Sequence, residues 1–399
     1  MLALIGLCAA PAQGADPWRR HTIDDSSRGA DGVRLADVNA DGRPDIVTGW
    51  EQGGVTRVYL NPGPAKARQK WPAVTVGKTP NVEDAVFSDL DGDGATDVVT
   101  CCEGKTRAMF VHWAPKEKGR LLMPDAWKTE AIPAATGVMM WMFCVPAQID
   151  GVRGVDLVAA GKGKGAQLGW FEAPENPRDP AAWQWHPLLD VGWIMSLVLF
   201  DMDDDGDRDI LATDRKGKTR GVFWLENPGP GPALAKPWPR HDIGGAGHEV
   251  MFLVPVTGDV ADGLRNILVA TKPRDILHLR RTARDTKRWW PQTIRIPDTA
   301  GTAKAVAFGD IDLDGRRDVV FTCEGAKGNL SGVMWLSYRK APTDAVWDAH
   351  NISGPEGVKY DLVELVDLDA DGDLDVLTCE EAANLGVIWY ENPTRRPPR

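Results

Sequence analysis

Residues 201–209, DMDDDGDRD, constrain the fold of this chain more than any other stretch. Carboxylates stand at positions 1, 3, 5 and 9 of this short loop and a glycine at position 6, as Asp201, Asp203, Asp205, Asp209 and Gly206. Carboxylates at alternate positions of a tight loop turn inward and present hard oxygen ligands to one cation. Ca²⁺ prefers about six to eight such oxygens, and position 7 can add its backbone carbonyl. The loop therefore predicts a calcium site, and its glycine permits the sharp reversal.

The same loop occurs four more times with the same spacing. Its ligand positions are Asp37, Asn39, Asp41 and Asp45; Asp89, Asp91, Asp93 and Asp97; Asp310, Asp312, Asp314 and Asp318; and Asp367, Asp369, Asp371 and Asp375. The glycine is present each time, as Gly42, Gly94, Gly315 and Gly372. We therefore predict about five structural Ca²⁺ ions per chain.

An EF-hand is excluded by the twelfth position, which would have to supply a bidentate glutamate. The chain has Thr48, Thr100, Ala212, Phe321 and Thr378 there. Each loop also continues directly into an apolar run, such as DIVT or DVVT, that is typical of a strand. The pattern indicates a strand–calcium–strand turn, and the alternative is a solvated acidic hairpin without metal.

Two further copies are degraded, at 148–156 and 258–266, and calcium is doubtful in both. The seven copies begin at residues 37, 89, 148, 201, 258, 310 and 367, so the repeat length is 52 to 59 residues. A repeat of this length with short strands predicts a β-propeller.

Two other repeats divide each blade into four strands. A Trp-x-x-His type of motif occurs seven times, from WRRHTI at residue 18 to WDAHNI at residue 347, and a GVxW motif begins at Gly221, Gly332 and Gly386. Strand A precedes the calcium loop, strand B follows it, strand C carries GVxW and strand D carries Trp-x-x-His. We predict an all-β, seven-bladed propeller of four-stranded antiparallel blades. The first strand D, WRRHTI, precedes blade 1, and the last blade ends after strand C. WRRHTI is therefore expected to complete the last blade and close the ring, leaving no exposed sheet edge.

Residues 1–14, MLALIGLCAAPAQG, are predicted to be a secretory signal, 15–393 a single propeller, and 394–399 a disordered tail. A secreted or periplasmic location follows, with no membrane span. Five bound Ca²⁺ would change the net charge of −11 to about −1, so the acidity does not imply a basic partner. No basic face or motif predicts nucleic-acid binding.

The DxDxDGxxD loops between strands A and B resemble the FG-GAP/VCBS repeat family over about residues 18–393. Members of that family include integrin α-subunit heads and many secreted bacterial proteins, and related propellers occur in polysaccharide lyases and sugar dehydratases. The resemblance implies the propeller fold and calcium. It does not imply a particular reaction.

The predicted topology places the calcium loops on one face, which we call the bottom, and the D–A and B–C connections on the top. Six residues past each loop come Glu51, Glu103, Lys162, Arg215, Lys272, Glu324 and Glu381. Six residues before each loop come Asp31, Glu83, Met142, Met195, Phe252, Lys304 and Asp361. The glutamates belong to blades 6, 7, 1 and 2, and the cations to blades 3, 4 and 5. We expect a polarised pocket with one acidic arc and one basic arc beside Trp193.

Aromatic walls suit sugar rings, and cations suit a carboxylate or sulfate. The sequence therefore favours a binding propeller that recognises a carbohydrate (an acidic glycan) or a protein partner on its top face. The alternative is a polysaccharide lyase or sugar dehydratase acting by β-elimination, with His248, Tyr360 or Lys304 as proton donor or acceptor. An ion-paired rim that only holds the blades together is also consistent with these charges.

Overall fold

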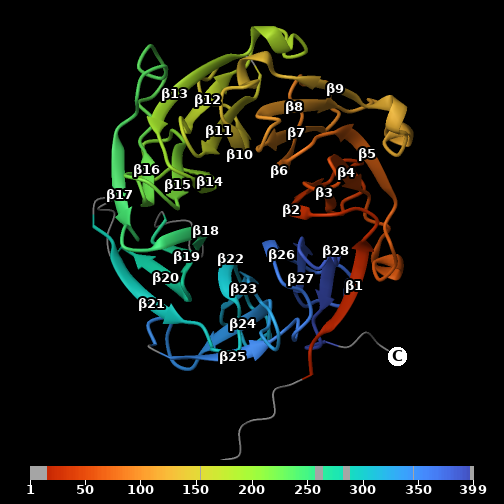
Figure 1. Cartoon of the computed structure of the whole chain (residues 1–399), viewed down its shortest axis with the longest axis vertical. Coiled ribbons are helices and arrows are strands. Elements are labelled where there is room, and N and C mark those ends of the chain that lie inside the picture. The colour runs from red at the N-terminus through yellow and green to blue at the C-terminus, as the bar shows by residue number, and fades with distance from the viewer. Residues whose placement is uncertain (1–15, 153, 257–263, 282–287, 345, 396–399) are drawn as a thin grey trace, which may run out of the picture.

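The computed structural model describes residues 16–152, 154–256, 264–281, 288–344 and 346–395. Seven four-stranded antiparallel sheets form a ring around a central channel (Figure 1). This confirms the predicted seven-bladed propeller. The predicted signal segment, the last four residues of the predicted tail and most of the degraded loop in blade 5 lie outside the described residues.

Each blade runs outward from the channel in the order A, B, C, D. Blade 1 comprises β2 (Ala30–Ala36), β3 (Asp45–Trp50), β4 (Val55–Tyr59) and β5 (Ala73–Lys78). Blade 2 comprises β6 (Val82–Ser88), β7 (Asp97–Cys102), β8 (Ala108–Trp113) and β9 (Lys128–Ala131). Blade 3 comprises β10 (Met140–Ala147), β11 (Asp156–Lys162), β12 (Gln167–Glu172) and β13 (Gln184–Asp190). Blade 4 comprises β14 (Ile194–Phe200), β15 (Asp209–Asp214), β16 (Gly221–Leu225) and β17 (Arg240–Gly244).

The remaining blades follow the same plan. Blade 5 comprises β18 (Glu249–Val256), β19 (Asn266–Lys272), β20 (Asp275–Arg280) and β21 (Trp290–Arg295). Blade 6 comprises β22 (Thr302–Gly309), β23 (Asp318–Glu324), β24 (Val333–Tyr338) and β25 (Trp347–Asn351). Blade 7 comprises β26 (Tyr360–Val366), β27 (Asp375–Glu380), β28 (Gly386–Glu391) and, as its outer strand, β1 (Arg19–Asp24).

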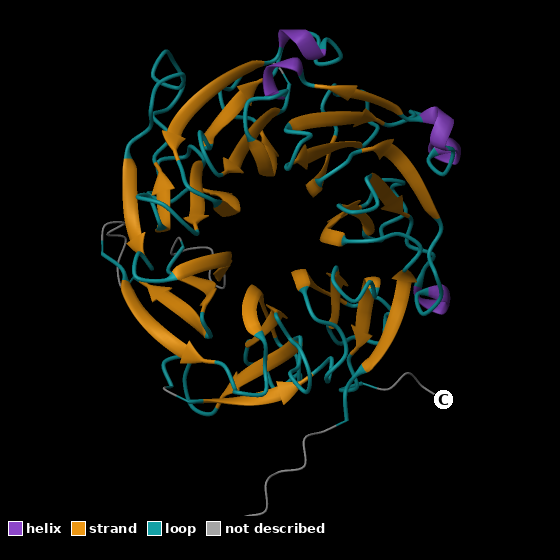
Figure 2. Cartoon of the chain, viewed as in Figure 1, coloured by secondary structure: helices purple, strands orange, loops and turns teal. Residues whose placement is uncertain are grey.

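Five short 3₁₀ helices occur in the connections of blades 1 to 3, and Figure 2 shows them at the outer rim. They are η1 (Pro64–Lys66), η2 (Lys118–Arg120), η3 (Pro124–Ala126), η4 (Pro133–Ala135) and η5 (Pro180–Ala182). Within the described residues, no helix is long and apolar enough to cross a membrane.

The N-terminal strand closes the ring, as predicted. β1 pairs antiparallel with β28, and the register places Arg20 opposite Tyr390 and Thr22 opposite Ile388. Asp24 also accepts a hydrogen bond from the hydroxyl of Tyr59, at 2.9 Å, and so ties the closing strand to blade 1. The closing strand therefore joins the last blade to the first.

The B strands explain why the sequence after each loop is continuously apolar. Every residue of β3, β7, β15 and β27 is buried, because these strands pack between neighbouring blades on both faces. The Trp-x-x-His repeat has a structural role too. Its histidines stack on tryptophans of strand C, with centroid separations of 4.5 Å for His21 on Trp389 and 3.8 Å for His350 on Trp335.

Candidate functional site

The calcium-type loops are closed by their own backbone amides. In blade 1, the position-1 carboxylate of Asp37 accepts hydrogen bonds from the amides of Asp41, at 3.0 Å, and Gly42, at 2.8 Å. Gly42 has a φ of 83° although a Cβ there would meet nothing within 4 Å. Glycine is therefore favoured at position 42 because it adopts a positive φ easily, and not because a side chain would lack space, as predicted from the sharp reversal.

The position-9 aspartates are the most deeply buried members of the loops. Asp45 is fully buried and accepts from the amides of Val38, at 3.0 Å, and Asn61, at 2.7 Å. Burial raises the pKa of Asp45 to about 6 and that of Asp375 to about 8, although backbone hydrogen bonds act against this. Each of these carboxylates thus fastens its loop to the start of the C–D connection.

Acidic oxygens converge in the loops, and several have no partner. Oxygens of three carboxylates lie within 4.8 Å of one another in the loops of blades 2, 4 and 6, from Asp89, Asp91 and Asp97; Asp201, Asp203 and Asp209; and Asp310, Asp312 and Asp318. Buried oxygens of Asp203, Asp310 and Asp371 accept no hydrogen bond. Because a buried carboxylate oxygen without a partner is costly, these loops fit a bound cation.

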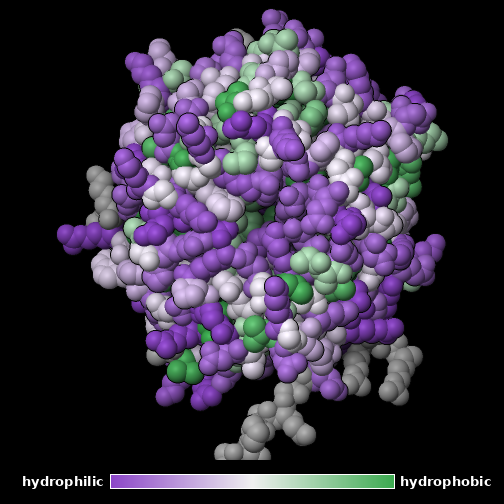
Figure 3. Space-filling model, viewed as in Figure 1, coloured by the Kyte–Doolittle hydropathy of each residue, from purple (hydrophilic) through white to green (hydrophobic). Residues whose placement is uncertain are grey.

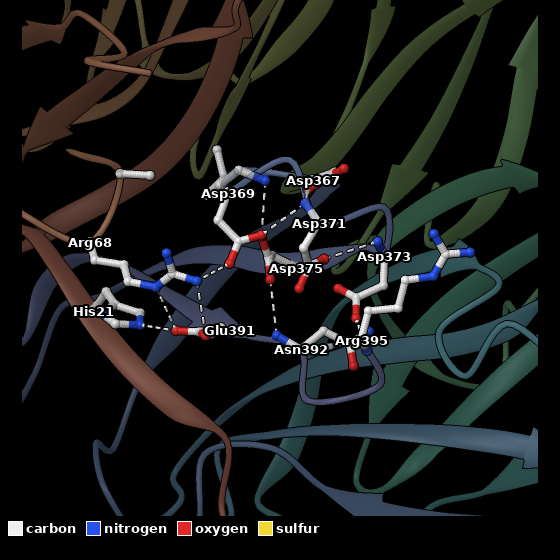
Figure 4. Close-up of polar contacts among 12 residues, drawn as sticks. His21, Arg68, Asp367, Asp369, Asp371, Asp373, Asp375, Glu391, Asn392 and Arg395 are labelled. Carbon is white, nitrogen blue, oxygen red and sulfur yellow. Dashed lines mark hydrogen bonds and ion pairs between the residues drawn. The ribbon is translucent and has the colours of Figure 1, made fainter. Parts of the chain in front are cut away.

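Arginines from the next blade contact two of the loops. Figure 4 shows the blade 7 loop, where Arg68 from the C–D connection of blade 1 pairs with Asp369 and with both oxygens of Glu391, each at 3.0 Å. In the same way, Arg178 from blade 3 pairs with Asp91 and, at 3.0 Å, with Asp93 in the blade 2 loop. These contacts compensate part of the acidic charge of each loop.

The degraded loop of blade 3 has a glutamine at position 1. The side-chain oxygen of Gln148 accepts from the amides of Asp150 and Gly151, at 3.1 and 2.9 Å, whereas Asp37 in blade 1 accepts from positions 5 and 6 of its loop. Its side-chain nitrogen donates to the carbonyl of Gly154 at 2.7 Å. The Gln148 side chain therefore makes hydrogen bonds on both sides of this turn.

The opposite end of the channel carries a charged cavity, which we call the funnel. The funnel has a volume of about 280 Å³. Ten of the eleven ligand-binding residues predicted from the sequence line it, namely Asp31, Glu51, Glu83, Glu103, Lys162, Trp193, Arg215, Glu324, Asp361 and Glu381. The eleventh, Lys272, pairs with Glu324. In Figure 3, hydrophilic side chains surround the central opening of the face in view.

The charged residues of the funnel do not form one acidic and one basic arc, in contrast to the polarised pocket that the sequence predicts. Cations pair with carboxylates across blade boundaries: Lys162 with Glu83 (3.0 Å) and Glu103, Lys272 with Glu324, and Lys304 with Asp361. Lys359 also pairs with Glu381, and Arg215 with Glu249. Seven carboxylates and four cations line the funnel, so its surplus charge is negative.

A buried carboxyl pair lies at the junction of blades 7 and 1. Asp31 and Asp361 are 6% and 2% exposed and share a hydrogen bond. Burial, followed by the charge of Asp361, raises the pKa of Asp31 well above its usual value. Burial acts in the same direction on Asp361, but the charge of Lys304 and the hydrogen bond from Asp31 lower its pKa overall. The pKa values of the two carboxyl groups are therefore shifted in opposite directions.

Trp193 differs from the open stacking wall expected for a sugar ring. Lys162, Arg215 and Lys216 place their charged groups 4.7, 4.5 and 4.7 Å from the centre of its ring. The indole thus acts as a cation–π partner that gathers these side chains. Apolar lining comes instead from Phe143 and Phe252, whose rings are 5.4 Å apart in an edge-to-face arrangement.

The three proton-transfer candidates differ from one another in where they lie. His248 lies on a top-face turn before β18 and does not line the funnel. Tyr360 is fully buried, and its hydroxyl is bonded to the carbonyl of Glu356, at 2.6 Å, and to the Tyr390 hydroxyl, at 2.9 Å. Burial raises the pKa of Tyr360, so we correct its assignment to a structural role.

Lys304 does line the funnel, but its ammonium group is paired with Asp361. Burial alone would lower its pKa, and the charge of Asp361 raises it overall, so Lys304 stays protonated. Lys359 and Phe143 line the funnel without having been predicted. Lys359 lies two residues before Asp361, and Phe143 directly follows Met142; the repeat spacing identifies both Asp361 and Met142.

Comparison with known proteins supports the repeat assignment. A family model described as an FG-GAP-like repeat matches residues 37–100, which span the loops of blades 1 and 2. The match and the seven blades confirm the resemblance to FG-GAP/VCBS propellers. No curated protein sequence matches the chain significantly.

One similar solved structure is the crystal structure of BBS1N in complex with ARL6DN. The TM-score is 0.54, the sequence identity is 9%, and the alignment covers 94% of this chain and 96% of the other. At this identity the likeness establishes the fold alone. FG-GAP propellers generally serve binding or structural roles, so the fold supports a role of that general kind.

Proposed function

We propose that the chain is a calcium-stabilised binding propeller whose funnel binds a carbohydrate through its hydroxyl groups. One observation carries the proposal: ten of the eleven predicted residues, all except Trp193 chosen by their distance from the loops, line one cavity. Random drift of surface residues would not place seven carboxylates from several blades around a single opening. The opposite face, with its acidic loops, would then stabilise the scaffold.

Calcium is proposed at blades 1, 2, 4, 6 and 7. The unpartnered buried oxygens of Asp203, Asp310 and Asp371 support this assignment, because a hard cation would satisfy them. Extracellular calcium modules bind with dissociation constants of about 10⁻⁴–10⁻³ M. Such sites would fill outside the cell, which agrees with the predicted secretory signal.

The charge balance favours a neutral or amino sugar over the acidic glycan suggested by the sequence. The lining cations already pair with carboxylates, so an incoming carboxylate or sulfate would have to displace one. Glu51, in contrast, is half-buried and has no ion pair within the described residues. Burial, followed by the charges of Glu381 and Glu103, raises its pKa. It is the carboxylate best placed to accept from a ligand hydroxyl.

Replacing Glu51 with glutamine should weaken carbohydrate binding by about tenfold or more. The lost hydrogen bond to a charged group contributes about 1.5–3 kcal/mol. Ligands would first be identified on an array of neutral, amino and acidic glycans, and affinities then measured by calorimetry. Glu117→Gln, on an exposed outer connection, is the matched control and should bind normally. Unchanged affinity in Glu51→Gln would contradict the funnel site.

Replacing Arg215 with alanine distinguishes a neutral sugar ligand from an anionic one. Arg215 pairs with Glu249 and lies over Trp193 at the funnel wall. For a neutral sugar we expect less than a threefold change in affinity, or about 0.7 kcal/mol. A loss of about 1.5–3 kcal/mol would instead show that an anionic group is held there. Thermal melting is measured in parallel, because the Arg215 side chain is 11% exposed and its loss also removes the contact with Trp193.

A further inference from the structure

A second cavity lies in the central channel, closer to the calcium loops than the funnel is. Its volume is about 360 Å³, within the range of about 300–1,000 Å³ that is typical of small-molecule sites. It is lined by residues of β2, β14, β18, β22 and β26, which are A strands around the channel in Figure 1. Its two charged lining residues, Arg34 and Glu364, stand three positions before Asp37 and Asp367, where their loops begin. We call this cavity the lower chamber.

The lower chamber and the funnel are two levels of one channel. Phe252 lines both cavities, and its ring packs edge to face on Phe143, which lines the funnel. On β26, Asp361 of the funnel stands three positions before Glu364 of the lower chamber. Because strand A runs from the top face toward its calcium loop, the lower chamber lies beneath the funnel. A ligand of the lower chamber would therefore contact a different set of charged side chains.

The lining side chains of the lower chamber are apolar, apart from Arg34, Glu364 and Ser196. Five aliphatic side chains that line it are each between 6% and 8% exposed, namely Leu197, Leu253, Val306, Leu362 and Val363. Ser196 is already used, because its hydroxyl oxygen accepts from the amide of Leu253 at 3.5 Å. These walls favour a ligand with an apolar body.

The backbone adds polar groups to the lower chamber. Each A strand pairs only with strand B of its own blade, so it forms the inner edge of its sheet. Alternate N–H and C=O groups of an edge strand point away from its partner and take no part in the ladder. Some of these groups are satisfied locally, as where the hydroxyl of Thr378 donates to the carbonyl of Leu362 at 2.7 Å. Channel-side carbonyls without such a donor are acceptors for a ligand.

Glu364 is a carboxylate without a partner. In the part of the chain that the structure describes, it makes no hydrogen bond and no ion pair. Arg34 does not compensate it directly, because its guanidinium group donates to both oxygens of Asp84, at 3.1 and 3.3 Å. Burial raises the pKa of Glu364, and the charge of Arg34 acts in the opposite direction. Since Arg34 and Asp84 neutralise each other, Glu364 leaves the lower chamber with a surplus negative charge.

We propose that the lower chamber binds a small primary amine with an apolar body. The ammonium group pairs with Glu364, and its remaining hydrogen atoms are donated to channel-side carbonyls, because a primary ammonium has three donors. The apolar body packs against the aliphatic walls. A calcium ion fits less well, because it prefers about six to eight oxygen ligands and the chamber offers one carboxylate.

The test compares cyclohexylamine with cyclohexanol and with the trimethylammonium analogue, each titrated against the full chain by saturation-transfer NMR. We expect cyclohexylamine to bind at least about tenfold more tightly than either analogue, because it alone combines the charge with three donors. Glu364→Gln keeps the shape of the side chain and should weaken amine binding by about tenfold or more. Glu117→Gln, on an exposed outer connection, is the matched control and should bind normally.

Filling the lower chamber is a second test. Ala307→Leu enlarges a lining side chain and should abolish binding of all three probes. Melting curves show whether each variant folds, and Glu364→Gln decides the question if Ala307→Leu does not. Glu364→Gln should melt no lower than the original chain, because it removes a half-buried charge without a partner.

Three results would overturn the proposal. One is equal binding of cyclohexylamine and cyclohexanol, or no saturable binding of the amine at millimolar concentrations. Another is unchanged amine affinity in Glu364→Gln. The third is a larger loss of amine affinity in Glu51→Gln than in Glu364→Gln, which would place the amine in the funnel. None of these results depends on whether the funnel binds a carbohydrate, so the two proposals can fail separately.

Discussion

Chelating calcium with excess EDTA should lower the melting temperature of this propeller by about 10 °C or more. Carboxylates about 5 Å apart repel each other by about 3 kcal/mol per pair at an effective dielectric constant near 20. A site occupied at a calcium concentration about 100 times its dissociation constant contributes about 2.7 kcal/mol. Five such sites together would contribute on the order of 10 kcal/mol, a large part of the stability of any domain. Calorimetry with and without EDTA measures the difference.

The blade 4 loop should respond most strongly to single substitutions. Within the described residues, no ion pair reaches Asp201, Asp203 or Asp205, whereas arginines compensate the loops of blades 2 and 7. Asp203→Asn should remove one Ca²⁺ from a wild-type stoichiometry of about five, measured by equilibrium dialysis. Asp204→Asn is the matched control, because Asp204 is at position 4 with a φ of 65°, a conformation that asparagine tolerates. A melting curve unchanged by EDTA would contradict the calcium assignment.

The fold could be predicted because its determinants are local and repeated. Each acidic loop fixes where strand A ends and strand B begins, and the glycine at position 6 fixes the turn. Strand alternation then decides which residues face the channel. It also explains one error: Asp361 lines the funnel, whereas Tyr360, the preceding residue on the same strand, is buried away from it. Spacing from the loop identified Asp361 alone, whereas Tyr360 was a candidate because its phenol can donate or accept a proton.

The pairing of the funnel charges could not be predicted from the repeat. Lys162 belongs to blade 3 but bonds to Glu83 and Glu103 of blade 2, and such contacts depend on the angle between neighbouring blades. The loop position of Gln148 was likewise read as a degraded metal site. In the structure its amide oxygen accepts from the backbone and its amide nitrogen donates to the backbone within the same turn. Contacts between repeats are not encoded in the spacing within one repeat.

Two residues of the predicted tail are described by the structure. Thr394 and Arg395 belong to the segment predicted to be disordered. The amide of Thr394 donates to the side chain of Asn392 at 3.0 Å, and that of Arg395 to Asp373 at 2.7 Å. Residues 394–399 were predicted to be a disordered tail from their composition, because a run of proline and arginine lacks the alternation that is typical of a strand. The hydrogen bonds come from neighbouring side chains of the blade 7 loop and strand, which a tail's own sequence does not reveal.

Deleting residues 16–24 should unfold the whole ring rather than fray one end. The deletion removes Ile23, which is 1% exposed, and the ladder with β28. Loss of one large buried side chain alone costs about 2–5 kcal/mol. It also removes Asp24, whose carboxylate binds Arg57 at 2.6 Å and Tyr59 at 2.9 Å in blade 1. Because β1 contacts both the last blade and the first, we expect one cooperative loss of structure by circular dichroism.

A circular permutant distinguishes the effect of losing strand β1 from the effect of moving the chain ends. Joining residues 395 and 16 by a short linker is feasible, because Trp18 and Thr394 line the same groove. New ends between Glu117 and Lys118, in the exposed C–D connection of blade 2, make β9 the N-terminal closing strand. This permutant should melt within a few degrees of the original chain, because every strand keeps its partners. If it unfolds like the deletion, or if the deletion melts normally, closure by β1 does not stabilise the ring.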